Sequence, residues 1–310
     1  MKYYEVEFTL IPCSQDAQDI LPAIVGEAGF ETFEETENGL KGYVQQSMFD
    51  AGVMDTLIEQ FPLMNTRVSY EVREAEDRDW NEQWEKEGFE PILVRSTQHI
   101  AGSERTLVIH DGRHFSGFSL SDYDLSIEID AHMAFGTGTH ETTRMICSAL
   151  LDEQSVNGQW PKANVLDCGC GTGILGICAL KLGAKSCTAY DIDEWSVENT
   201  RHNSIINQVE ERMIILHGDA TLLQPDNRIV GITTDSIVSC FDFVMANINR
   251  NILLQDMEHF VSVMVPGATL ILSGFYQDDC QILISKAQSL GLTLHDTRHD
   301  GDWACLSFKL

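Results

Sequence analysis

Apolar and polar positions alternate in the first segment of the chain. Even-numbered positions from Tyr4 to Leu10 are apolar and the odd-numbered positions between them are polar, which predicts a half-buried strand. Apolar residues then recur at helical spacing over residues 16–28, where Ser14 is placed to cap the helix and Gly29 to end it.

A hairpin signal follows this helix. Asn38-Gly39 separates two strand-like stretches, and this dipeptide favours tight two-residue turns. The hairpin strands, a second helix and a last strand are predicted at residues 30–37, 40–46, 49–61 and 67–73. The order βαββαβ predicts a small α+β domain over residues 1–75, with the ferredoxin-like arrangement of two helices on one face of an antiparallel sheet.

Charged residues dominate from 76 to 91, and we interpret this stretch as a charged connecting helix or linker. Trp80 and Trp84 are four residues apart and would share one helix face. We expect them to anchor the connector against a domain; an aromatic pair that binds a partner is the alternative.

Strand-like and helical stretches alternate through the rest of the chain, which predicts a mostly parallel sheet covered on both faces. The clearest strands and helices lie at 164–167, 174–183, 186–190, 194–207, 241–246, 250–264 and 269–273. Residues 292–296 and 304–308 flank a turn at 300–302, so the sheet is expected to end in an antiparallel hairpin. We therefore predict a doubly wound, Rossmann-like α/β domain over residues 92–310. Residues 224–240 have no clear period and are interpreted as a surface insertion.

The composition of the chain limits which partners the protein can bind and in which cell compartment it works. The 310-residue chain has a formal net charge of −28, which would repel a phosphate backbone, so direct nucleic-acid binding is not expected. A basic protein partner is favoured, although acidity that serves only solubility explains the charge equally well. Nine cysteines without framework spacing, the lack of a membrane-length apolar stretch and the lack of a signal peptide predict a cytoplasmic enzyme without membrane attachment.

The most informative stretch is a glycine-rich turn between a predicted apolar strand and a predicted helix. It reads Asp167-Cys168-Gly169-Cys170-Gly171-Thr172-Gly173. Gly169 and Gly171 allow a ligand to approach the backbone closely. Asp191 follows Gly169 by 191 − 169 = 22 residues, at the end of the next strand. This spacing is typical of a nucleotide-binding βαβ unit whose carboxylate binds ribose hydroxyls.

Asp167 distinguishes between the possible ligands, because a carboxylate directly before the turn would repel a pyrophosphate and suits an ammonium group. S-adenosylmethionine carries an ammonium, a ribose and an adenine, and is therefore the predicted cofactor. Cys168 and Cys170 form a C-x-C pair, but no second pair or histidine cluster completes a tetrahedral site. We expect no metal.

Residues that follow the strands form the candidate site, since ligands of such sheets lie beyond the carboxyl ends of the strands. Asp191 is predicted to bind the ribose, Asp219 to accept the adenine amine and Asn247 to hold the incoming nucleophile. Structural roles are the alternatives: a turn residue for Asp219 and a helix cap for Asn247, while Asp193 is assigned to a cap outright.

A second run, Met133 to Arg144, reads M-A-F-G-T-G-T-H-E-T-T-R and precedes an amphipathic helix. Its glycines and threonines make a donor-rich loop that can bind a ligand or cap the helix. By itself the pattern favours capping for Thr142 or Thr143, and an ordinary loop hydrogen bond for His140.

This loop, the glycine turn at 167–175 and Ala246-Asn247-Ile248 together resemble the ribosomal protein L11 methyltransferase family, over about residues 77–275. The connector Asp77-Arg78-Asp79-Trp80 is similar as well. The glycine turn fits most methyltransferases that use S-adenosylmethionine, whereas the AFGTGTHETT loop is much more restrictive. The resemblance implies that methyl groups are transferred to lysine or N-terminal amines of ribosomal protein L11, and that the small N-terminal domain recognises this substrate.

Four cofactor contacts of that family fall on matching positions here, Thr143, Gly169, Asp191 and Asn247. The match favours a binding role for Thr143 over a capping role. Transfer to an amine needs a neutral nitrogen with a free lone pair, and Asn247 is predicted to position it. No residue is an evident general base; His140 is the nearest candidate. Asn249 departs from the family, where an apolar residue is common.

Three other functions remain open at this point. A nucleic-acid N6-adenine methyltransferase commonly has N-P-P-Y after the fourth strand, whereas Asn247 is followed by Ile248-Asn249-Arg250. A non-catalytic factor that binds S-adenosylmethionine and a ribosomal partner would keep the same cofactor residues. An NAD-dependent oxidoreductase is disfavoured by the glycine spacing.

Overall fold

Two groups of residues make most of their contacts internally, Met1–Glu82 and Gln83–Leu310. The computed structural model describes residues 3–36, 38–46, 48–59, 61–63, 66–74, 88–97, 104–114, 119–131, 136–157, 160–223 and 240–310. Each unit has a hydrophobic core of its own.

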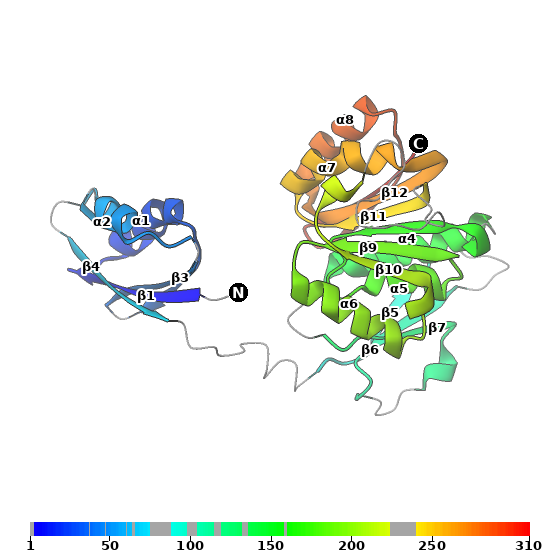
Figure 1. Cartoon of the computed structure of the whole chain (residues 1–310), viewed down its shortest axis with the longest axis horizontal. Coiled ribbons are helices and arrows are strands. Elements are labelled where there is room, and N and C mark those ends of the chain that lie inside the picture. Colours follow the sequence, from blue (N-terminus) through cyan, green and yellow to red (C-terminus); the bar gives the residue numbers. More distant parts are fainter. Residues whose placement is uncertain are drawn as a thin grey trace. The chain divides into compact units, whose positions relative to one another are not determined.

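Four antiparallel strands and two helices make up the N-terminal unit (Figure 1). In chain order they are β1 (Tyr3–Ile11), α1 (Gln15–Val25), β2 (Phe30–Thr36), β3 (Gly39–Gln45), α2 (Ala51–Glu59) and β4 (Arg67–Glu74). The strand order in the sheet is β2-β3-β1-β4, and both helices lie on the same face of it (Figure 1). The predicted ferredoxin-like arrangement is therefore confirmed.

Local sequence signals explain these elements. Val6, Phe8 and Leu10 of β1 are buried, as the alternation predicts. The Ser14 hydroxyl accepts the Ala17 amide at 3.3 Å, which caps α1. A side chain at Gly39 would overlap the carbonyl oxygen of Phe8, so the hairpin needs glycine at this point.

The predicted connecting helix with Trp80 and Trp84 falls mainly on residues 75–87, outside the described ranges. Just after it, the Phe89 amide donates to Asp111 Oδ2 at 3.1 Å, and the Phe89 ring packs on the core of the second unit. The structured part of this unit therefore begins before the predicted boundary at Ile92.

A small sheet precedes the main one in the second unit. It contains β5 (Ile92–Arg95), β6 (Thr106–His110) and β7 (Leu125–Glu128), with β5 antiparallel and β7 parallel to β6. The sequence predicted a mostly parallel sheet in this domain and did not identify a separate small sheet at its start, so this sheet is a correction. Periodicity identifies a strand but does not say which strands pair with it.

The main sheet has seven strands in the order β10-β9-β8-β11-β12-β14-β13. They are β8 (Asn164–Cys168), β9 (Ser186–Asp191), β10 (Met213–His217), β11 (Phe241–Asn247), β12 (Met264–Tyr276), β13 (Thr293–Asp300) and β14 (Trp303–Lys309). Strands β8 to β12 are parallel, and β14 is antiparallel to both β12 and β13. The doubly wound fold and the closing hairpin are both confirmed.

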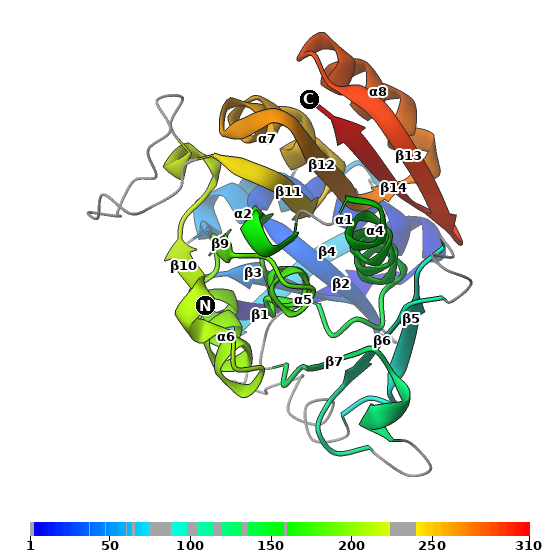
Figure 2. The same cartoon turned by 90° about the vertical axis from the view of Figure 1, so that its right-hand side faces the viewer.

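Helices cover both faces of this sheet (Figure 2). The helices are α4 (Glu141–Asn157), α5 (Ile174–Lys181), α6 (Glu194–Ile206), α7 (Arg250–Ser262) and α8 (Cys280–Ser289). Val165 packs into the core beneath α4 and α5, while its neighbour Leu166 packs into the core beneath α7 and α8. Successive side chains of a strand point to opposite faces, which is why the strands are continuously apolar. Among the described residues, no helix combines the length and the apolar character needed to cross a membrane.

Strand order reverses between β8 and β11, because the chain winds from β8 toward β10 and then returns to the other side of β8. Ligands of open α/β sheets bind at the carboxyl ends of the strands beside such a reversal. The glycine turn follows β8, and Asn247 is the last residue of β11. The topology thus brings the two sequence motifs to the same place.

Candidate active site

The glycine turn follows β8 directly and packs against the residue that follows β11. Gly169 has a φ of +70°, and a Cβ atom there would lie 2.5 Å from Cγ2 of Ile248. Gly171 is also left-handed, with a φ of +55°. Glycine therefore makes this tight turn and its close packing against Ile248 possible.

Asp191 lies opposite this turn at the end of β9. Its Oδ2 accepts the Gly171 amide at 2.9 Å, and its Oδ1 accepts the Asp193 amide at 3.0 Å. Each carboxylate oxygen has a second lone pair, and the side chain is partly exposed. The two backbone bonds hold the carboxylate in one orientation, as a bidentate acceptor for a diol requires.

Asp193 and Asp219 have structural roles. Asp193 caps α6 by accepting the Ser196 amide at 3.0 Å, which confirms its assignment. Asp219 Oδ1 accepts the amide and the hydroxyl of Thr221 at 2.9 and 2.5 Å, and these bonds lower the pKa of its carboxyl. The turn interpretation of Asp219 therefore holds; both bonds use the same oxygen, and the exposed side chain retains Oδ2 for a ligand.

Asp167 lies on β8 beneath the turn and is 1% exposed. Its Oδ2 accepts the Gly176 amide at 2.9 Å, whereas its buried Oδ1 has no hydrogen-bond partner among the described residues. Burial, with a smaller effect from the charge of Asp191, raises the pKa of Asp167 to about 7. A cationic hydrogen-bond donor at the turn would satisfy Oδ1 and favour the charged carboxylate.

Asn247 and Thr143 meet at the end of β11. The Asn247 Nδ2 donates to Thr143 Oγ1 at 3.3 Å, and Thr143 is fully buried in the first turn of α4. The Asn247 Oδ1 is buried and has no partner within the described part of the chain. One atom of the amide is thus fixed by Thr143 and the other is available to a ligand.

The residues that cap α4 and α7 differ from those that the sequence suggested. The start of α4 is capped by His140, whose Nδ1 accepts the Thr142 amide at 3.3 Å, so the capping expected of Thr142 or Thr143 is wrong. The start of α7 is capped by Asn249, whose Oδ1 accepts the amides of Asn251 and Ile252. A capping role for Asn247 is therefore also wrong, and the cap explains the polar residue at position 249.

His140 is held by its neighbours. Its Nδ1 lies 2.8 Å from Thr142 Oγ1, and its ring meets Trp303 edge-on at 4.7 Å. The Thr142 amide donates to Nδ1, which favours the tautomer with hydrogen on Nε2. In that tautomer neither nitrogen offers a free lone pair, so a role as general base would require this arrangement to change.

The loop before α4 contacts the glycine turn. Residues 132–135 lie outside the described ranges; beyond them, Thr172 Oγ1 donates to the Gly136 carbonyl at 2.6 Å. The two motifs found separately in the sequence therefore form one site with Asn247. Asp191 reaches the same turn through Gly171.

The sequence analysis missed three buried asparagines of α6 and its C-terminal cap, one of which supports the glycine turn. Asn203 Nδ2 donates to the Thr172 carbonyl at 2.9 Å. Asn199 and Asn207 likewise donate to carbonyls of Asp130 and Glu128. Their i, i+4, i+8 spacing was the available signal, since polar residues at that spacing on an otherwise buried helix face need partners.

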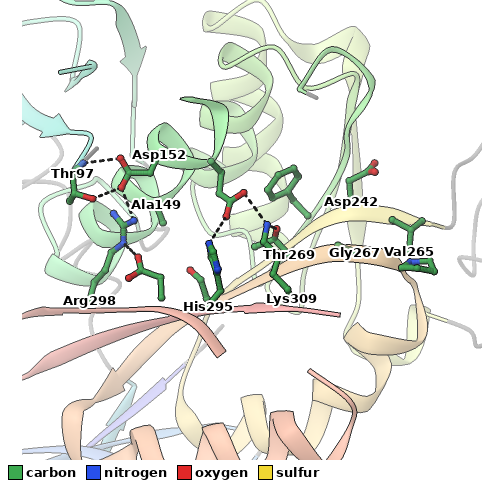
Figure 3. A pocket seen from close by; sticks show the side chains of 16 residues that line it. Thr97, Ala149, Asp152, Asp242, Val265, Gly267, Thr269, His295, Arg298 and Lys309 are labelled. Atoms are coloured by element: carbon green, nitrogen blue, oxygen red, sulfur yellow. Dashed lines mark hydrogen bonds and ion pairs between the residues drawn. The ribbon is translucent and has the colours of Figure 1, made fainter. Parts of the chain in front are cut away.

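A cavity lies at the other end of the sheet (Figure 3). It has a volume of about 550 Å³ and is lined by residues near the start of β11 and the end of β14, among others. Arg298 pairs with Asp152 at 2.7 Å, and Lys309 pairs with Glu153 at 3.1 Å (Figure 3). These ion pairs join α4 to the C-terminal hairpin, and the cavity is not part of the candidate site.

A metal site does not form around the C-x-C pair. Cys168 is buried in the core on one face of the sheet and Cys170 in the core on the other. Within the described ranges, no group of three or more histidine, cysteine or acidic side chains is placed to hold an ion.

Known proteins match this chain along its whole length. The family model described as Ribosomal protein L11 methyltransferase (PrmA) matches residues 15–310. The ribosomal protein L11 methyltransferase of Bacteroides fragilis is 43% identical over 310 residues, covering 100% of both chains. That of Porphyromonas gingivalis is 42% identical and covers 99% of this chain and 98% of its own.

A solved structure supports the fold. The crystal structure of ribosomal protein L11 methylase from Lactobacillus delbrueckii subsp. bulgaricus has a TM-score of 0.52 at 24% identity, covering 65% of this chain and 93% of that one. The sequence match and the shared α/β fold confirm the resemblance drawn from the loop, the glycine turn and Asn247. The chain therefore belongs to the ribosomal protein L11 methyltransferase family.

Proposed function

We propose that this protein transfers methyl groups from S-adenosylmethionine to amino groups of ribosomal protein L11, on lysine side chains, the N-terminal amine or both. The observation that carries the proposal is the Asn247–Thr143 pair. It lies beside a glycine turn with left-handed backbone at Gly169 and Gly171, in a chain of this family.

The residues of the candidate site fit the cofactor group by group. Asp191 would accept the ribose hydroxyls, the backbone at Gly169 and Gly171 would allow close approach, and the free Oδ1 of Asp167 would accept the ammonium. Asp219 would accept the adenine amine through Oδ2, since its turn uses Oδ1. The Thr143 hydroxyl accepts from Asn247 and keeps its own hydrogen to donate.

S-adenosylmethionine supplies an activated methyl group on a sulfonium sulfur. The protein must present a neutral amine, and neutralising a lysine with a reference pKa near ~10.4 costs about 4 to 5 kcal/mol at pH 7. The unpartnered Asn247 Oδ1 would accept one N–H of the amine and direct its lone pair toward the methyl carbon. Thr143 keeps that oxygen in position by holding the amide nitrogen.

The N-terminal unit is proposed to recognise L11. It has its own core and sheet, and the acidic chain, with a net charge of −28, suits a basic protein partner. Methylation of a ribosomal protein would take place in the cytoplasm, where ribosomes assemble.

The test is to incubate the purified protein with methyl-labelled S-adenosylmethionine and a mixture of ribosomal proteins. We expect the label on the L11 band and none when L11 is left out. Label on another band would overturn the assignment of the substrate. Cofactor binding by calorimetry without any transfer would identify a non-catalytic factor instead.

A further inference from the structure

Three aromatic rings from distant parts of the chain meet at the edge of the sheet where Asn247 lies. Tyr276, the last residue of β12, pairs in register with Trp303, the first residue of β14. Their rings stack at 4.4 Å and 27°. The His140 ring stands edge-on to Trp303 at 4.7 Å and 71°.

The cluster is connected to Asn247 through two elements, the start of α4 and β12. His140 precedes Thr143 by three residues, and Thr143 accepts the Asn247 amide. On the other side Asn247 pairs in register with Ser273 of β12, so Tyr276 projects roughly 10 Å beyond it along the strand. A Cβ atom at Gly274 would lie 2.5 Å from the Ile248 carbonyl oxygen, which shows how closely β12 passes the end of β11.

The Tyr276 ring is exposed to solvent, although burying an aromatic ring is normally favourable. Trp303 packs one side on the core beneath α4, yet Tyr276 is 53% exposed. Stacking alone gives only about 0.5 to 1.5 kcal/mol, and much of the Tyr276 surface stays in contact with water. The exposed ring of Tyr276, stacked on Trp303 at the end of the strand that pairs with β11, is a surface on which a side chain can lie.

The surroundings of the rings are acidic. Asp278, Asp279, Asp300 and Asp302 follow or precede the two aromatic residues closely in the chain. Asp279 and Asp300 pair with Arg250 and Arg144, whereas Asp278 and Asp302 have no ion pair among the described residues. An aromatic face with carboxylates around it favours a cation that carries apolar groups.

We propose that the stacked rings of Tyr276 and Trp303 bind the methylated ammonium group that each transfer produces, together with the alkyl chain that carries it. The inference rests on the proposed function. The amine nitrogen forms the new N–C bond with its lone pair, the electron pair of the broken C–S bond stays on sulfur, and the positive charge passes to nitrogen. The rings thus hold a product that carries both charge and methyl groups, and retain it beside Asn247.

A binding experiment tests the rings without any protein substrate. Choline serves as the probe and 3,3-dimethylbutan-1-ol as its uncharged isostere, and the reporter is the indole N–H signal of Trp303 in NMR spectra, assigned by its loss in Trp303→Phe. We expect choline to shift this signal with a Kd at least about threefold lower than that of the alcohol. Equal effects of the two compounds would overturn a cation-binding role.

Variants of Tyr276 test whether choline binding needs an aromatic ring or only an apolar side chain at this position. Tyr276→Leu should weaken choline binding about threefold, whereas Tyr276→Phe keeps the ring and should bind within twofold of the wild type. Ile282→Ala, an equally exposed apolar position on α8 at 52%, is the matched control. Choline binding that is the same in Tyr276→Leu and Tyr276→Phe would overturn the proposal.

Kinetic measurements with L11 as substrate test whether the rings of Tyr276 and Trp303 contribute to methyl transfer. Tyr276→Leu should lower kcat/KM for a monomethylated amine more than for the unmodified amine, while its affinity for S-adenosylmethionine stays unchanged. An equal loss for both amines, or a matching loss of cofactor affinity, would overturn the proposal. If the wild type does not methylate L11, the proposed function fails, and the choline experiment still decides whether the rings bind a cation.

Discussion

Asn247 donates its side-chain amide hydrogen to the hydroxyl of Thr143 across 104 residues of sequence, at 3.3 Å. The bond ties the end of β11 to the start of α4, and it uses the nitrogen of the amide. Because Nδ2 is used, Oδ1 remains buried without a partner among the described residues. An unsatisfied buried acceptor costs about 1 to 3 kcal/mol, which a bound N–H donor would recover.

Removing this amide should affect the rate more than cofactor binding. Asn247→Ala is expected to lower single-turnover methyl transfer by up to about 100-fold, because the amine loses its alignment. Calorimetry should show the affinity for S-adenosylmethionine reduced far less. Parallel losses in both measurements would make Asn247 a cofactor contact only.

A carboxylate at the same position should make transfer depend on pH. Asn247→Asp would attract the ammonium and favour its protonated, unreactive form. The rate should therefore fall at pH 7 and partly recover as the pH rises toward about 10, near the reference pKa of lysine. An Asp variant as fast as the wild type at every pH would remove Asn247 from amine presentation.

Asp191 is expected to contribute to cofactor affinity. Asp191→Ala removes the acceptor pair for the ribose and should weaken binding of S-adenosylmethionine by roughly 1.5 to 3 kcal/mol. The change also leaves the Gly171 and Asp193 amides without their acceptor, so thermal unfolding must first show a folded variant. Unchanged affinity in that folded protein would place the ribose elsewhere.

We expect the second unit to bind the cofactor and the N-terminal unit to bind the protein substrate. A fragment of residues 83–310 keeps the Phe89 contacts with the second core and should bind S-adenosylmethionine as the full chain does. It should fail to methylate intact L11, because the N-terminal unit is proposed to hold the substrate. Transfer to L11 at the full-length rate would show that this unit is not required.

Asp167 should make the stability of the protein depend on pH. Burial raises its pKa from 3.8 to about 7, so between these values the folded state keeps a proton that the unfolded state releases. The free energy of unfolding therefore falls as the pH rises through this window. Asp167→Asn removes the effect.

Urea unfolding of the two proteins without cofactor, at several pH values between about 4 and 8, measures this contribution. The stability of Asp167→Asn relative to the wild type should increase with pH, by at most about 1.4 kcal/mol per pH unit, and level off above the raised pKa. A difference that does not change with pH would mean that the pKa of Asp167 is ordinary.

Features set by a few neighbouring residues were predictable from the sequence. The alternation in β1, the Ser14 and Asp193 caps and the closing hairpin depend on local periodicity and hydrogen bonds. The glycine turn is also local, because the left-handed backbone at Gly169 excludes other residues. The alternation of strands and helices then restricts the chain to a doubly wound sheet.

Contacts between distant segments needed the tertiary structure. Local pattern alone favoured capping by Thr142 or Thr143, yet His140 caps α4 and Thr143 turns to Asn247. Strand order likewise separates β5, β6 and β7 into their own sheet and brings Tyr276 onto Trp303. Sequence determines which residues can form strands, turns and caps, because those interactions span a few residues. Which side chains meet at the site depends on how the strands are ordered, and that order is decided by burying both faces of the sheet at once.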